Sequence, residues 1–196
     1  MLGFKRASGL FPSMTVIGIV GLPGSGKSEA AAVAEELDVP VVTMGDVIRA
    51  ACEDRGLDPS THHGEVARTL REEGGVDAIA ERSLPIIEDA LADNDVVLVD
   101  GIRSDAEVER FEEAFGDDFL LVAVHAPFEL RRERLGVRGR DATKDEGGES
   151  LRERDERERG FGMDAAMDDA DVTIENTGTL EAFHDRVREL LREAGA

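Results

Sequence analysis

Residues 21–28 read GLPGSGKS, and this segment constrains the fold of the chain more than any other. It matches the pattern G-x-x-x-x-G-K-S/T, directly after the apolar run TVIGIV and directly before the helical pattern KSEAAAVAEEL. Glycines allow several backbone N–H groups to turn toward one anion, and the N-terminus of the following helix adds a positive dipole. The sequence therefore predicts a strand, a phosphate-binding loop and a helix in direct succession.

The residues of this phosphate-binding loop, or P-loop, have separate expected roles toward ATP and Mg²⁺. Lys27 is expected to neutralise the β- and γ-phosphates and to act in catalysis, and the Ser28 hydroxyl is expected to ligate Mg²⁺. Asp100 ends the apolar run VVLVDG and is the expected second magnesium residue, although it could also be a strand-terminal turn residue. The remaining positions expected to surround the phosphates are Gly21, Leu22, Pro23, Gly24, Ser25 and Gly26.

Short apolar, β-branched runs alternate with longer helical patterns along the chain. The runs lie at 15–20, 39–43, 96–99, 120–125 and 172–174. Continuous apolar runs bounded by turn or charged residues are typical of strands buried on both faces of a parallel sheet. The helical patterns lie at about 27–37, 46–55, 61–73, 76–92, 104–115, 127–135, 149–159 and 178–193. We therefore predict an α/β P-loop NTPase fold, with a five-stranded parallel sheet and helices on both faces.

The same pattern predicts a single domain over residues 14–196, preceded by a flexible tail at residues 1–13. Two connections within this domain are unusually rich. Residues 46–93 hold three helical patterns and are the predicted acceptor-binding region. Residues 131–159 are the predicted lid-like segment. Long insertions of this kind, in a single compact domain, are where substrate-binding elements and lids usually occur.

The lid-like segment is rich in arginine. Nine arginines and Lys144 face nine carboxylates there, so its net charge is +1, whereas the rest of the chain carries −22. A solvated helix with ion pairs such as Arg154–Glu158 explains part of this pattern. A lid whose arginines close over transferring phosphates also explains the glycine-rich stretch GVRGRDATKDEGGES.

The overall charge excludes some partners. Lys and Arg total 23 against 44 Asp and Glu, a formal net charge of −21, which disfavours binding to nucleic acid or to membrane surfaces. Only three residues are lysine, and Trp and Tyr are absent, as expected of a protein adapted to high salt; an ordinary acidic cytosolic protein is the alternative. No apolar run approaches the roughly 20 residues that span a bilayer, so we expect a cytoplasmic protein.

Two further segments resemble signatures of adenylate kinase and its nucleoside-monophosphate kinase relatives. They are MGDVIRAA at residues 44–51 and DGIR at residues 100–103. This resemblance implies that Asp46 begins the acceptor-binding helix and that Arg49 and Arg103 hold the phosphate of the acceptor nucleotide. The family usually has Asp-Gly-aromatic-Pro-Arg, whereas here Arg103 follows Asp100 by three residues and the proline is missing.

The C-terminal half carries two more resemblances. Arg134 and Arg138 match the Arg-x-x-x-Arg spacing at the first lid hinge of adenylate kinases, which implies contact with the transferring phosphoryl group. The stretch ADVTIENTGTLEAF resembles the end of dephospho-coenzyme A kinase, which implies that Asn176 lies beside the adenine of ATP. From Met14 to the C-terminus, the chain resembles an archaeal P-loop kinase-like family related to both enzymes, whose reaction is poorly settled.

These features together imply a kinase that transfers the γ-phosphate of ATP to a small nucleotide or nucleotide-like acceptor. A nucleoside monophosphate is favoured because its phosphate needs no general base; for the hydroxyl of dephospho-coenzyme A, Asp46 would accept the proton. A regulatory P-loop protein with slow or no phosphotransfer is the alternative. Arg71, in the acceptor-binding region, is either an anion ligand or an exposed helical arginine. The oligomeric state is left open.

The charge of −21 makes stability depend on salt. Dissolved ions shorten the range of carboxylate repulsion, to a Debye length of about 3 Å at 1 M. We expect the melting temperature to rise from low to molar KCl, as measured by thermal unfolding. A melting temperature that is flat or falls over this range would contradict adaptation to high salt.

Overall fold

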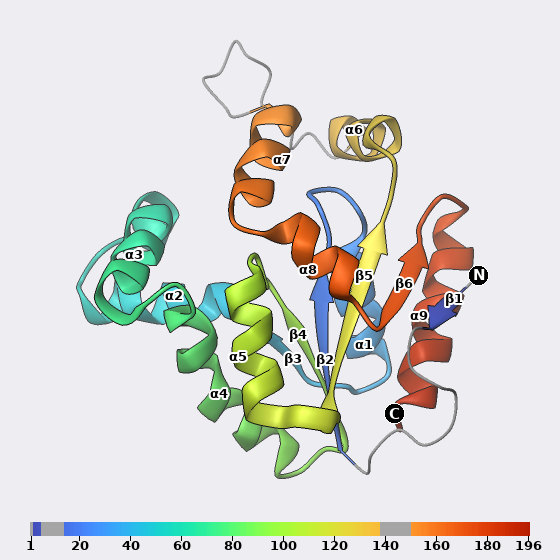
Figure 1. Cartoon of the computed structure of the whole chain (residues 1–196), viewed down its shortest axis with the longest axis horizontal. Coiled ribbons are helices and arrows are strands. Elements are labelled where there is room, and N and C mark those ends of the chain that lie inside the picture. Colours follow the sequence, from blue (N-terminus) through green and yellow to red (C-terminus); the bar gives the residue numbers. More distant parts are fainter. Residues whose placement is uncertain (1, 5–13, 138–149) are drawn as a thin grey trace.

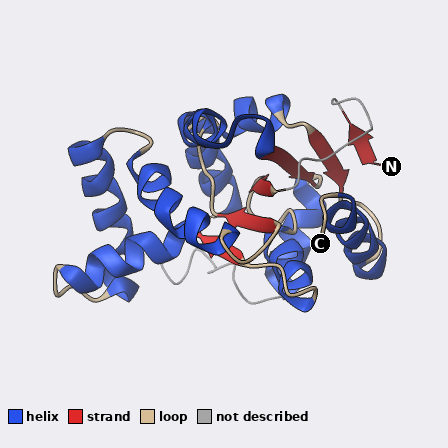
Figure 2. Cartoon of the chain, turned by 90° about the horizontal axis from the view of Figure 1, so that it is seen from below, coloured by secondary structure: helices blue, strands red, loops and turns tan. Residues whose placement is uncertain are grey.

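The computed structural model describes residues 2–4, 14–137 and 150–196, and its centre is a six-stranded β-sheet with helices on both faces (Figures 1 and 2). The strand order is β1-β6-β5-β2-β4-β3. Strands β2 to β6 are mutually parallel, which confirms the predicted five-stranded sheet. Their bounds are β2 Thr15–Val20, β3 Val41–Thr43, β4 Val96–Asp100, β5 Phe119–His125 and β6 Val172–Glu175.

One additional strand joins the edge of the sheet. Strand β1, Leu2–Phe4, pairs antiparallel with β6 and belongs to the segment predicted as a tail. The sequence analysis did not predict this strand, since three residues are too few to show an alternating pattern. Residues 1 and 5–13 lie outside the part of the chain that the structure describes.

Strand β2 occupies the middle of the sheet and ends at the P-loop. All six of its residues are buried, as the continuous apolar run predicts. A Cβ added at Gly18 would lie 2.6 Å from the ring of Phe119 and 2.9 Å from Ile102, so a side chain does not fit there. The absence of a side chain at Gly18 lets the aromatic ring pack directly against the central strand.

Helices cover each face of the sheet and enclose two apolar cores. Helices α1, Lys27–Glu36, and α9, Leu180–Glu193, cover one face with side chains such as Val33 and Phe183. The other face packs against α4, Ala78–Leu91, and α5, Asp105–Phe115, with Phe111 and Phe119 stacked at 5.8 Å between ring centroids. This arrangement confirms the predicted α/β class.

Two short elements were missing from the sequence prediction. They are the 3₁₀ turn η1, Gly116–Asp118, and helix α8, Met163–Asp169, which packs near β2, β5 and α5. Helix α8 has only two buried residues, Met163 and Ala166. A seven-residue helix with two apolar contacts gives too little periodicity to recognise.

Three helices between β3 and β4 form an arm on one side of the sheet (Figure 1). They are α2, Met44–Asp54, α3, Pro59–Gly74, and α4, and each packs against the other two. We call α2 and α3, the part that extends beyond the sheet, the helical arm. It corresponds to the first part of the predicted acceptor-binding region at 46–93.

Helices α6, Phe128–Val137, and α7, Leu151–Gly160, lie beyond the carboxyl ends of the strands (Figure 1). The guanidinium of Arg131 on α6 donates two hydrogen bonds, of 2.8 and 2.7 Å, to the carboxylate of Asp155 on α7. Arg131 also donates to the carbonyl of Pro23 in the P-loop at 3.0 Å. Both side chains of the pair are at most 4% exposed, so this buried ion pair connects both helices to the P-loop.

Within the ranges described, no helix is both long enough and apolar enough to cross a bilayer.

The buried ion pair predicts a large effect of one substitution. Asp155→Ala leaves the Arg131 charge buried without its partner, which should lower the free energy of unfolding by about 3–5 kcal/mol. The measurement is urea unfolding at constant high KCl. The control is Glu129→Ala, because Glu129 pairs with Arg132 on an exposed helix surface, and the cost there should be about 1 kcal/mol or less. Equal losses for the two variants would contradict this assignment.

Candidate active site

A cavity of about 440 Å³ lies at the carboxyl ends of the parallel strands, where ligands bind in open α/β sheets. The P-loop, the loop after β4, helices α6 and α7, and the segment between β6 and α9 all contribute to it. The side chains at its wall include three P-loop residues, one carboxylate from the end of β4 and arginines from three separate segments. The residues lining it are Pro23, Gly24, Gly26, Lys27, Ser28, Glu29, Asp100, Gly101, Ile102, Arg103, Leu130, Arg134, Leu135, Arg154, Glu158, Asn176, Gly178 and Leu180.

The P-loop needs glycine at two crowded positions. Gly24 and Gly26 have φ values of 79° and 124°, which side-chain-bearing residues rarely adopt. A Cβ at Gly26 would also lie 2.5 Å from the Nδ2 of Asn176. The glycine spacing in the sequence is thus required both by the turn and by the segment that packs against it.

Lys27 is the cation at the centre of the loop. Its Nζ donates to the carbonyl of Gly21, and the side chain lines the cavity. Desolvation at this enclosed position lowers the pKa of Lys27, while the nearby charges of Glu158 and Asp100 act in the opposite direction. A phosphate group in the cavity would act in the same direction as these carboxylates and stabilise the ammonium form.

Asp100 and Ser28 both line the cavity, as expected for two residues that hold Mg²⁺. The Oδ1 atom of Asp100 is buried and accepts no hydrogen bond from the described protein atoms. A buried carboxylate oxygen normally has a hydrogen-bond donor or a cation as its partner. A bound cation, or a water molecule that the cation holds, would be a suitable partner for this oxygen. A hydroxyl and a carboxylate oxygen are suitable Mg²⁺ ligands, and these two residues therefore fit the ion.

Asn176 and Arg134 connect the P-loop to the segment after β6. The buried Asn176 donates from Nδ2 to the carbonyl of Ser25 at 2.7 Å. Arg134 donates to the backbone and side-chain oxygens of Asn176 at 3.0 and 3.1 Å. Part of the Asn176 amide is thus used inside the protein, and the predicted contact of Asn176 with adenine stays a prediction.

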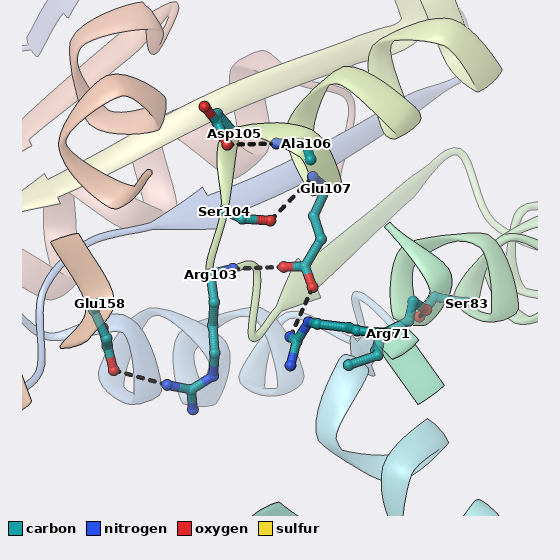
Figure 3. A network of polar contacts seen from close by, with 9 residues as sticks. Arg71, Ser83, Arg103, Ser104, Asp105, Ala106, Glu107 and Glu158 are labelled. Carbon is teal, nitrogen blue, oxygen red and sulfur yellow. Dashed lines mark hydrogen bonds and ion pairs between the residues drawn. The ribbon is translucent and has the colours of Figure 1, made fainter. Parts of the chain in front are cut away.

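Arg103 lines the cavity and is held at both ends (Figure 3). Its Nη1 donates to Oε1 of Glu158 on α7 at 2.7 Å, and its backbone N–H donates to Oε2 of Glu107 on α5 at 2.8 Å. Arg71 on α3 donates to the other oxygen of Glu107 at 3.0 Å. The chain of contacts runs from the helical arm, through Glu107 on α5 and Arg103 in the loop after β4, to Glu158 on α7.

The sequence analysis did not single out Glu107 or Glu158 as site residues. The stretch SDAE at 104–107 does carry a helix-start signal, and Ser104 accepts a hydrogen bond from the Glu107 backbone at 3.2 Å. That signal does not indicate that the Glu107 carboxylate pairs with Arg71. Glu158 was interpreted as a helical partner of Arg154, whereas in the structure it pairs with Arg103, 55 residues away.

Among the described residues predicted for the site, Asp46 and Arg49 do not line this cavity, and neither do Gly21, Leu22 and Ser25 of the P-loop. Asp46 and Arg49 lie on α2 and form an exposed ion pair with each other, through Arg49 Nε at 2.7 Å. Their predicted contacts with the acceptor stay predictions. Arg138 lies outside the described residues, so the structure does not test its predicted contact with the transferring phosphoryl group.

Comparison with known sequences gives relatives over most of the chain. The AAA_17 family, described as an AAA domain, matches residues 20–152. A UPF0200 protein from Halobacterium salinarum is 63% identical over 178 residues, which cover 91% of this chain and 93% of that protein. A UPF0200 protein from Methanosarcina barkeri is 46% identical over 181 residues, covering 91% of this chain and 95% of that protein.

Comparison with solved structures gives matches to the fold. The crystal structure of TT1252 from Thermus thermophilus aligns with a TM-score of 0.64 at 21% identity, covering 94% of this chain and all of that one. Shikimate kinase from Acinetobacter baumannii, in complex with shikimate, aligns with a TM-score of 0.55 at 18% identity, covering 92% of each chain. At these identities the similarity shows a shared fold.

The geometry of the P-loop generates a direct test. Lys27→Ala should abolish ATP binding measured by calorimetry, because the only P-loop cation is removed from the cavity. The change in the free energy of unfolding should stay below about 1 kcal/mol, since the lost group is a partly desolvated charge and not core packing. Arg82→Ala, an exposed substitution on α4, is the matched control. Wild-type ATP affinity in Lys27→Ala would refute the assignment of the loop.

Proposed function

Because the chain belongs to the UPF0200 family, an archaeal P-loop kinase-like family, we propose that it is an ATP- and Mg²⁺-dependent kinase for a small nucleotide acceptor. The acceptor we favour is a nucleoside monophosphate, followed by dephospho-coenzyme A. A small-molecule acceptor also agrees with the net charge of −21, which opposes binding of a long polyanion. A protein with these substrates would act in the cytoplasm.

One observation carries the proposal: four cationic side chains from four segments line the same cavity as Asp100. They are Lys27 from the P-loop, Arg103 from the loop after β4, Arg134 from α6 and Arg154 from α7. Phosphoryl transfer spreads negative charge over the oxygens of the moving group, and fixed cations around it lower the barrier. A site that only bound a nucleotide would not need cations from so many sides.

The expected reaction divides among these residues. The P-loop N–H groups and Lys27 would bind the β- and γ-phosphates of ATP, and Ser28 and Asp100 would hold Mg²⁺. When bound, Mg²⁺ neutralises charge on these phosphates. Arg103 would hold the acceptor, and an oxygen of the acceptor would attack the γ-phosphorus. The new O–P bond forms while the bond from the γ-phosphorus to the bridging oxygen breaks. ADP is the leaving group. Arg134 and Arg154 would stabilise the transferring group.

The position of the carboxylates supports an acceptor that is already anionic. A hydroxyl acceptor requires a base, and the residue predicted for that role, Asp46, is exposed and paired with Arg49 on its own helix. A phosphate oxygen can attack without a base. This difference favours a nucleoside monophosphate over dephospho-coenzyme A.

The test is a steady-state screen with ATP and Mg²⁺ in high KCl, using AMP, CMP, UMP and dephospho-coenzyme A as acceptors. We expect transfer to at least one of the monophosphates. Asp100→Asn should lower the rate at least about 100-fold, because a metal that stabilises charge in the transition state contributes several kcal/mol.

The matched control for this variant is Asp93→Asn, an exposed carboxylate before β4, which should leave the rate unchanged. Tight ATP binding without transfer to any of the four acceptors would refute the kinase and favour the regulatory alternative.

A further inference from the structure

We propose that Arg71 acts together with Arg103 to bind the phosphate group of the acceptor, and that Glu107 is the positioning residue that holds both in place. This inference rests on the proposed kinase function, since it concerns the acceptor side of the same site. It names Arg71 as an acceptor ligand and makes a terminal phosphate the feature by which an acceptor is recognised.

Glu107 is a buried carboxylate with a partner on each oxygen. Its side chain is 1% exposed, Oε1 accepts from Arg71 Nη2 at 3.0 Å, and Oε2 accepts from the backbone N–H of Arg103 at 2.8 Å (Figure 3). A buried charge is stable only when it has such partners, so the loss of either contact would lower the free energy of unfolding. The carboxylate therefore fixes the Arg71 guanidinium relative to the backbone of the loop after β4.

The guanidinium of Arg103 is fixed by a second carboxylate. Glu158, which is 4% exposed and lines the cavity with Lys27, accepts from Arg103 Nη1 at 2.7 Å. Among the residues the structure describes, this is the hydrogen bond that the Arg103 guanidinium makes, and its side chain stays 48% exposed. The group therefore keeps donors that can reach a ligand at the cavity mouth.

Arg71 is not among the residues that line the cavity, and it is connected to the cavity wall through Glu107, which also accepts from the backbone of Arg103. Figure 3 shows its guanidinium and that of Arg103 on the same side of the Glu107 carboxylate. The side chain is 25% exposed, and it also packs against Phe161, at 5.9 Å from the ring centroid. Across residues 14–137 and 150–196, the guanidinium donates one hydrogen bond, to Glu107. Two positioned guanidinium groups with remaining N–H donors suit the several oxygens of one phosphate.

A purely structural role explains Arg71 less well. Replacing both members of a buried ion pair by apolar side chains of similar size is often neutral for stability, so stability alone does not explain why an arginine and a glutamate occupy these two positions. Arg68, one turn earlier on the same helix, shows an ordinary surface arginine: it is 71% exposed and lies 3.7 Å from Glu72. Arg71 differs because it donates to Glu107, the carboxylate that also accepts from the backbone of Arg103.

The experiment measures binding of AMP and adenosine by calorimetry, using the full chain saturated with Mg²⁺ and a non-hydrolysable ATP analogue. Saturation excludes AMP from the donor site. Arg71→Ala should weaken AMP binding about 10- to 150-fold, the value of one charge-assisted hydrogen bond, and leave adenosine and ATP-analogue binding unchanged. Arg68→Ala is the matched control and should change none of the three affinities.

Two further variants separate a binding role from a structural one. Arg71→Lys keeps a charge for Glu107 but loses the planar fork, so the fold should persist while AMP binding weakens by an intermediate amount. Glu107→Gln keeps the size of the side chain and should weaken AMP binding while the bound ATP analogue is unaffected. In turnover, both should raise the KM for AMP more than they lower kcat.

The outcomes separate this inference from the function on which it rests. Unchanged AMP affinity in Arg71→Ala, or equal losses for AMP, adenosine and the ATP analogue, would overturn the role of Arg71. Failure of the wild-type protein to bind any of AMP, CMP, UMP and dephospho-coenzyme A in the same assay would overturn the proposed acceptor class. Arg71-dependent AMP binding without any phosphoryl transfer would support the subsite and refute the kinase.

Discussion

The buried ion pair between Arg131 and Asp155 is the contact on which the shape of the candidate site depends. It joins α6 to α7, and its arginine also donates to the carbonyl of Pro23, so both helices are attached to the P-loop itself. Because both side chains of the pair are at most 4% exposed, this connection between α6 and α7 is shielded from solvent. The side chains that α6 and α7 direct toward the cavity, Arg134, Arg154 and Glu158, owe their positions to it.

The cavity also shows how a cationic site is maintained before phosphate arrives. Lys27, Arg103 and other arginines would repel one another in an enclosed space. Asp100 lies close enough to act on Lys27, and Glu158 acts on Lys27 and pairs with Arg103. Protein carboxylates therefore hold the positive side chains in place. The free energy needed to bring these charges together is supplied when the chain folds, so they need not be rearranged when a ligand binds. In a chain with 44 acidic residues, these two carboxylates are distinguished by their position at the cavity wall and not by type.

The sequence was sufficient to predict the parallel sheet and the position of the P-loop, because both depend on local patterns: continuous apolar runs and fixed glycine spacing. It also identified Asp100, Arg103 and Asn176, which the structure places around one cavity. It could not identify Glu107 as a partner of Arg71, since the two residues are 36 positions apart and meet only because α4 packs against both α3 and α5. Local spacing predicts which helix face a residue occupies, whereas the choice of a distant partner is decided by tertiary packing.

Ile102, between Gly101 and Arg103, is fully buried. It packs against Gly18 on β2, beside the ring of Phe119. This apolar anchor leaves Asp100 and Arg103 on either side of it at the cavity wall. The separation between the carboxylate suited to the metal and the arginine suited to the acceptor is therefore set by hydrophobic packing. Changes in the core at Gly18 or Phe119 would alter the separation of Asp100 and Arg103, so in this protein the evolution of the core and the geometry of the cavity are not independent.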